Sequence, residues 1–148
     1  MTPASICGPT CGAPLFVHVL GATVLFGGVA TAALLAAVSL LRPPEQAALL
    51  HRVALGTLLL VVWPGFVATY AGGLWVLSRE GIFGHAPGWA LVGIGVGDAG
   101  VVVLLLVTLL AWLAKRRPGA GKLVAVISGL YLVALGVAWF AMSVKPGS

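Results

Sequence analysis

Few side chains in this sequence could bind a metal or carry a proton, and most of them stand among apolar residues. The 148 residues include three histidines, two cysteines and only three acids. A neutral imidazole can ligate haem iron or another transition metal, while sulfur ligands suit copper. What these residues can do therefore depends on which of them the fold brings together.

His18 is the leading candidate ligand, since it lies about one turn inside a long apolar run, in the sequence His18-Val19-Leu20-Gly21. In such a role its second ring nitrogen would be held by a backbone carbonyl or by Asp98. Asp98 would then act on a bound cofactor only through His18. A single histidine on an apolar helix face more often makes an ordinary hydrogen bond, so both interpretations stay open.

A second ligand for a metal at His18 must come from the same half of the membrane. His51 is excluded because its position at the other end of a span separates it from His18 by most of a hydrocarbon core about 30 Å thick. It is instead expected to be an interfacial polar residue beside Arg52. His85, Met142 or Tyr70 are the remaining possibilities, of which Met142 would contact a cofactor as a soft ligand.

Cys7 and Cys11 lie four residues apart ahead of the first apolar run. In an oxidising compartment we expect them to form a disulfide if their geometry allows it. The alternative is a soft metal site that also uses His85, for which copper is the best match.

Asp98 is the one acid inside an apolar run, near the expected centre of the bilayer. Inserting it costs on the order of 3 kcal/mol, so it should face the interior of the bundle, where it is either protonated or paired. It is a functional candidate, or else a carboxyl group hydrogen-bonded to Tyr131, Ser128 or a free backbone carbonyl. No nucleophile with a base, paired carboxylates or phosphate loop appears, so no catalytic residue is assigned and enzymatic activity stays open.

The elements that must position these residues are membrane-spanning helices. Hydrophobic residues make up 61% of the sequence and charged residues 7%, against roughly 25% charged residues in soluble domains. Apolar runs of more than roughly 18 residues predict helices, and the four runs cover about 14–41, 53–77, 88–114 and 123–144. We therefore expect an all-α membrane protein, with residues 1–148 forming one antiparallel four-transmembrane-helix bundle.

The charged linkers predict the orientation of the bundle. Positive charges gather in the linkers 42–52 and 115–122, which places these linkers in the cytoplasm and both termini outside. The lipid bilayer is the expected partner, together with a second copy or a larger membrane complex, and a nucleic acid has little support.

Small residues and one proline predict how the helices pack. Glycine and alanine recur at helical spacing and would serve a tight bundle or an oligomer equally well: Gly28, Ala32, Ala36, Ala68, Gly72, Gly93, Gly97, Gly129 and Gly136. Pro64, in the middle of the second run, predicts a kink because it removes a backbone donor.

Several of these motifs resemble those of a known family. His18-Val19-Leu20-Gly21 through Gly27-Gly28, Trp63-Pro64-Gly65 with Gly72-Gly73-Leu74-Trp75, and Trp139 to Pro146 resemble a bacterial family of four-helix integral membrane proteins classed as a domain of unknown function (number 2269). The resemblance implies a fold without an activity.

The histidine pattern of the first helix is also similar to those of the copper-resistance D membrane domains and of the membrane protoporphyrinogen oxidase that binds b-type haem. That likeness implies that His18 ligates haem or copper. This sequence departs from the pattern in its cysteine-bearing N-terminal segment, and its lack of a second suitable intramembrane histidine argues against haem held by two histidines.

Two functions follow from the sequence as hypotheses. One is a multi-pass protein of the bacterial cytoplasmic (inner) membrane that binds haem b or copper in a redox or metal-handling role. The alternative is a non-catalytic accessory or structural subunit of a larger membrane complex, with no cofactor.

Overall fold

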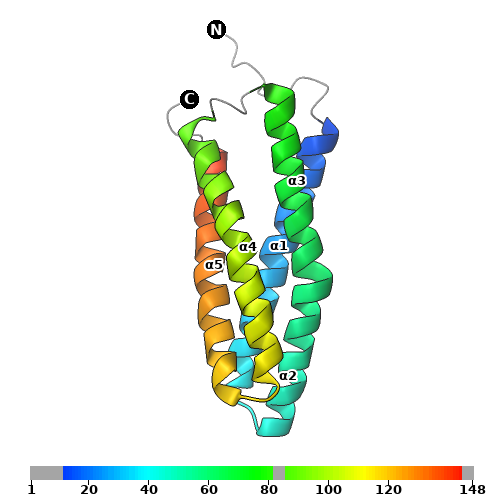
Figure 1. Ribbon diagram of the computed structural model, residues 1–148, viewed down its shortest axis with the longest axis vertical. Coiled ribbons are helices and arrows are strands. Elements are labelled where there is room, and N and C mark those ends of the chain that lie inside the picture. The colour runs from blue at the N-terminus through cyan, green and yellow to red at the C-terminus, as the bar shows by residue number, and fades with distance from the viewer. Residues whose placement is uncertain (1–11, 82–85, 145–148) are drawn as a thin grey trace.

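The computed structural model describes residues 12–81 and 86–144 as five α-helices and one π-helical turn (Figure 1). They are α1 (Gly12–Ser39), α2 (Pro44–Thr57), the π-helical turn η2 (Leu58–Val62), α3 (Trp63–Glu80), α4 (Gly88–Ala114) and α5 (Pro118–Val144). Because α2, η2 and α3 follow one another without a break, they form one candidate span of 37 residues.

The structure confirms an all-α bundle with four helices long and apolar enough to cross a membrane. The four spans run antiparallel to their neighbours in sequence (Figure 1). The second span begins at Pro44 rather than near residue 53, because a helix tolerates proline at its first position and continues through polar residues ahead of the apolar run. The apolar run therefore predicted the most apolar part of this helix and not its full length.

The two ends of the bundle differ in what they carry (Figure 1). We call the end where α1 begins and α5 finishes the terminal end. The opposite end carries the connections from α1 to α2 and from α4 to α5, and we call it the basic end after its lysines and arginines.

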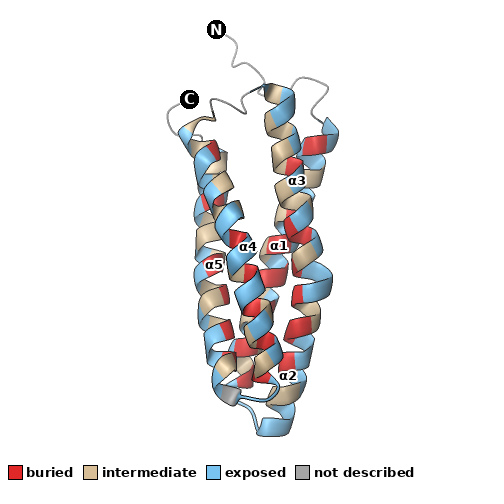
Figure 2. Cartoon of the chain, viewed as in Figure 1, coloured by how far each residue is buried: buried red, intermediate tan, exposed pale blue. Residues whose placement is uncertain are grey.

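Most of the buried core lies in the middle and in the basic half, where the helices meet around α1 (Figure 2). Most of its largest fully buried side chains are branched aliphatic residues from all four spans: Leu25, Val29, Leu58, Val62, Leu104, Val107 and Val124. Branched side chains of this size pack with few voids, so this half of the bundle is filled.

Glycines bring the backbones of α1 and α3 into direct contact. A Cβ atom at Gly21 would lie 2.5 Å from the backbone nitrogen of Thr69, and one at Gly65 would lie 2.9 Å from that of Leu25. Such close approach is how helices associate in lipid, where burial of apolar side chains gives little driving force. The contact fixes α3 on α1 along most of its length.

The structure divides the other small residues of the predicted stripes into two groups. Gly28, Gly72, Gly93 and Gly97 lie against side chains or backbone of neighbouring helices, so they serve packing within the bundle. By contrast, Cβ atoms at Gly129 and Gly136 would meet nothing within 4 Å among the described residues.

A π-helical turn precedes Pro64, at the place where the sequence predicts a kink. Within it the backbone N–H of Trp63 bonds the carbonyl of Leu58, five residues back. On one side of this turn α2 packs against α4, and on the other side α3 makes almost no backbone contact with α4 (Figure 1). The second span therefore packs against α1 on both sides of the turn but against α4 only as far as the turn, and the two halves of the bundle are packed differently.

The contact between α1 and α3 makes a direct prediction about stability. Gly21→Val should lower the free energy of unfolding by about 1–3 kcal/mol or more, because the added side chain must push backbone atoms of α3 away. Gly27→Val is the matched control, since nothing lies within 4 Å of a Cβ there. Unfolding in mixed detergent micelles measures both, and equal stability of the two variants would contradict the packing described.

Candidate functional site

A cavity of about 480 Å³ lies in the terminal half of the bundle, between α1, α3, α4 and α5. It exists because α3 packs against α1 and makes almost no contact with α4, so no backbone fills the space between α3 and α4. Its walls are mainly apolar and aromatic, with residues from all four helices: Leu15, Val19, Phe26, Phe66, Leu74, Trp89, Ile94, Leu135, Trp139 and Met142. Small-molecule and cofactor sites are of this kind, with volumes of roughly 300–1,000 Å³.

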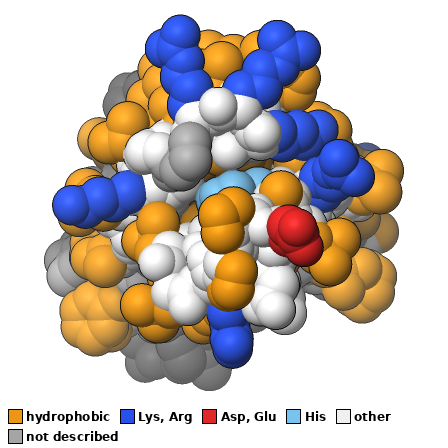
Figure 3. All heavy atoms as spheres, turned by 90° about the horizontal axis from the view of Figure 1, so that it is seen from below, with side chains coloured by type: hydrophobic (Ala, Val, Ile, Leu, Met, Phe, Trp, Pro, Cys, Tyr) orange, Lys and Arg blue, Asp and Glu red, His pale blue; other side chains and the backbone are white. Residues whose placement is uncertain are grey.

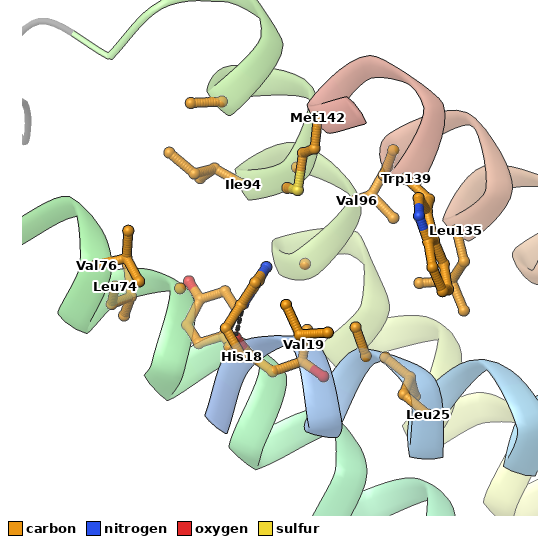
Figure 4. Close-up of a pocket in the computed structure, with 18 of the residues that line it drawn as sticks. His18, Val19, Leu25, Leu74, Val76, Ile94, Val96, Leu135, Trp139 and Met142 are labelled. Carbon is orange, nitrogen blue, oxygen red and sulfur yellow. Dashed lines mark hydrogen bonds between the residues drawn. The ribbon is translucent and has the colours of Figure 1, made fainter. Parts of the chain in front are cut away.

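His18 is a polar group on the wall of this cavity. Its Nδ1 atom lies 2.7 Å from the backbone carbonyl oxygen of Thr69 (Figure 4). A carbonyl oxygen only accepts hydrogen bonds, so Nδ1 must carry the proton and donate it. In a neutral ring the lone pair then lies on Nε2, which bonds no other described residue and is directed into the cavity (Figure 4).

Two adjacent glycines of α3 leave the space that His18 occupies. A Cβ at Gly72 would lie 2.8 Å from the backbone nitrogen of His18, and one at Gly73 would lie 3.1 Å from its Nδ1. Side chains at these positions would therefore push the imidazole away from the carbonyl of Thr69. Sequence reasoning did not assign this role to Gly73, although two adjacent glycines inside an apolar span are an unusual feature that points to a close approach.

Met142 lies on the wall of the cavity opposite His18 (Figure 4). Its thioether rests against Gly93 of α4, where any side chain would overlap its terminal methyl group. The predicted soft ligand and the predicted histidine ligand thus line one cavity.

Aromatic rings stiffen two walls of the cavity. Phe26 meets Trp139 edge to face, with ring centroids 5.9 Å apart, and Phe66 stacks on Tyr70 at 5.8 Å. Aromatic walls of this kind offer a large apolar contact area to an apolar ligand.

Asp98 does not face the interior of the bundle, which corrects the prediction. Its side chain is exposed at the surface of α4 and accepts a hydrogen bond of 2.5 Å from the hydroxyl of Tyr70 on α3. The preceding residue, Gly97, is the one turned toward the cavity, where it packs on the ring of Tyr70. One residue further along a helix is a rotation of about 100°, and this carries Asp98 to the edge that faces α3.

The expected partners of Asp98 are also different from those in the structure. The hydroxyls of Tyr131 and Ser128 are buried and bond no other described residue. The sequence left a backbone carbonyl and Asp98 as alternative partners for the non-ligating nitrogen of His18. In the structure this nitrogen, Nδ1, bonds the carbonyl of Thr69 and not Asp98. Asp98 therefore bridges the gap between α3 and α4 through Tyr70 and does not orient the histidine.

His51 lies at the basic end, far from the cavity, as the spacing predicted. It is buried, with 4% of its surface exposed, and its Nε2 lies 3.3 Å from the hydroxyl of Ser39. The imidazole is turned inward against Gly121 of α5, and its predicted place at the membrane interface stays a prediction. The absence of a Cβ at Gly121 makes the room that it occupies.

A metal site built from several protein ligands is not present in residues 12–81 and 86–144, which contain no group of three or more His, Cys, Asp or Glu side chains placed to hold an ion. Cys7, Cys11 and His85 lie outside these residues, so the predicted disulfide and the alternative copper site stay predictions.

The chain has no match among known proteins in three comparisons: no family model, no curated protein and no solved structure matches it. The resemblance to the family of unknown function and to the haem and copper families thus stays a prediction. The function must be argued from the cavity itself.

The pair of Tyr70 and Asp98 predicts a measurable coupling between α3 and α4. In a double-mutant cycle of Tyr70→Phe and Asp98→Ala, we expect a coupling energy of about 0.6–1.7 kcal/mol, from the average to the maximum of side-chain hydrogen bonds measured within membranes. Tyr131→Phe, combined with Asp98→Ala, is the control because the Tyr131 hydroxyl bonds no described residue. Additive effects of Tyr70→Phe and Asp98→Ala would show that the hydrogen bond does not form in a bilayer.

Proposed function

We propose that this chain is an integral membrane protein that binds haem b in the cavity of the terminal half, with His18 as an axial ligand, in a redox role. The observation that carries the proposal is the imidazole of His18, whose Nδ1 is held by the carbonyl of Thr69 at 2.7 Å. This leaves Nε2 directed at an apolar cavity of about 480 Å³ (Figure 4).

The bond to Thr69 is the kind of contact that prepares a histidine for ligation. Histidines that ligate metals commonly donate their other ring N–H to a carbonyl or carboxylate, which fixes the ring and raises its basicity. Unlike a hydroxyl or water partner, the carbonyl of Thr69 cannot reverse its role, so it selects one tautomer. His18 therefore needs no rearrangement to present a lone pair to iron.

The rest of the cavity fits haem b better than a copper ion. Haem brings four nitrogen ligands of its own and needs from the protein one or two axial ligands and apolar walls. Met142 is available as a second ligand, and a histidine with a methionine is a known axial pair. Copper would need several protein ligands, and a set containing Cys7, Cys11 or His85 draws on residues outside the described part of the chain.

The same proposal includes the orientation of the protein. The basic end would lie in the cytoplasm of a bacterium and the cavity in the outer half of its cytoplasmic membrane, according to the rule that positive linkers stay inside. A haem at that depth would be accessible to electron donors or acceptors at the outer surface. Both termini would lie on that side.

The test is the absorption spectrum of the purified chain, oxidised and reduced with dithionite, together with its iron, copper and haem content. We expect about one haem per chain, lost in His18→Ala because no other described residue offers an imidazole to the cavity. Added imidazole should restore haem to His18→Gly, which separates ligation from a general loss of structure. Met142→Leu should keep the haem and change its spectrum or its potential.

The matched control is His51→Gln, which removes a histidine outside the cavity and should leave the haem content unchanged. A folded wild-type protein that stays colourless after incubation with haemin would overturn the proposal. If that colourless protein also copurified with other membrane proteins, the accessory-subunit hypothesis would replace it. Gly129 and Gly136, where a Cβ would meet no described residue, would be the first positions to examine.

A further inference from the structure

Six of the eight lysines and arginines gather at the basic end, and the side chains of all six are exposed. They come from both connections, from α2 and from the start of α5: Arg42, Arg52, Lys115, Arg116, Arg117 and Lys122. Viewed along the bundle, lysine and arginine side chains stand around the rim of this end and not in one row (Figure 3). The basic end is thus ringed by positive charge.

These cations lack acidic partners within the described chain. Glu45 is the single described carboxylate at this end, and neither it nor any of the six cations takes part in an ion pair between described residues. Mutual repulsion of this kind is unfavourable unless anions from outside compensate it. The ring therefore points to an anionic partner.

Exposed apolar side chains stand directly beside the cations. Leu41 is 85% exposed next to Arg42, and Leu49 is 61% exposed one turn before Arg52. The guanidinium of Arg116 lies 5.4 Å from the ring centre of Trp112, which is itself half-exposed. Arg116 thus lies back along the side of the bundle, at the level where tryptophans meet lipid head groups.

Because charged and apolar side chains stand side by side, this surface suits a phospholipid better than a nucleic acid or an acidic protein. A nucleic acid or an acidic protein would bind to an end face through charges that project into water. A phospholipid instead offers a phosphate at the rim and acyl chains against the leucines and Trp112. The outward position of the cations, each within a few residues of an apolar span, favours the lipid.

We propose that the basic end binds anionic phospholipids of its own leaflet, with the phosphate groups held by the ring of arginines and lysines and the acyl chains lying against Leu41, Leu49 and Trp112. The site is separate from the cavity and does not depend on haem. Bound lipids would stabilise the bundle at this end, since they would contact the connection from α1 to α2, α2 itself and α4.

The test compares the full chain in nanodiscs of phosphatidylcholine with the chain in nanodiscs that also contain phosphatidylglycerol. We expect the unfolding midpoint to be higher by about 4 °C or more with phosphatidylglycerol, and the difference to shrink as salt is added. The combined variant Lys115→Gln, Arg116→Gln and Arg117→Gln should lose most of the difference. Arg79→Gln is the matched control, because this cation lies at the other end, in the last turn of α3, and the difference should remain.

Two results would overturn the proposal. The first is an equal unfolding midpoint in both kinds of nanodisc for the wild-type chain, a measurement that does not depend on any variant folding. The second is an equal rise on adding inorganic phosphate to phosphatidylcholine nanodiscs, which would show that the ring binds free anions and not the lipid. Neither result bears on the haem spectrum, so the lipid proposal and the haem proposal are tested independently of each other.

Discussion

The direct contact between the backbones of α1 and α3 is the constraint on which the rest of the structure depends. Gly21, Gly65 and Gly72 let the two helices approach so closely that a single added carbon would meet backbone atoms. The second span packs against α1 throughout, but beyond the π-helical turn before Pro64 its α3 part makes almost no contact with α4. The cavity is the space that this arrangement leaves open.

The same contact creates the chemistry of the cavity. It brings the carbonyl of Thr69 within hydrogen-bonding distance of His18, and the glycine at position 73 gives the imidazole room to reach it. Tyr70, one residue further along α3, extends across the gap to Asp98. A filled half that holds the bundle together and an open half that presents a histidine are thus consequences of one packing arrangement.

The number and approximate positions of the spans could be predicted because burying charge in lipid is costly, so each span appears in the sequence as a long apolar run with few charged residues. The separation of His18 from His51 followed from the same reasoning. The direction of Asp98 could not be predicted, because it depends on the rotation of α4, which the glycines at 93 and 97 set through their contacts with Met142 and Tyr70. A backbone carbonyl was one of the two partners predicted for His18, but which residue supplies it could not be predicted, because every residue of α3 carries a carbonyl.

The most direct test of this account is the tautomer of His18 in a bilayer, measured by solid-state nitrogen NMR on the chain labelled at its histidines, with His18→Gln to assign the signals. The structure requires that Nδ1 carries the proton, which it donates to Thr69, and that Nε2 has a free lone pair in the absence of a ligand. A protonated Nε2 with a bare Nδ1 would contradict the contact between α1 and α3 as described, and with it the cavity site.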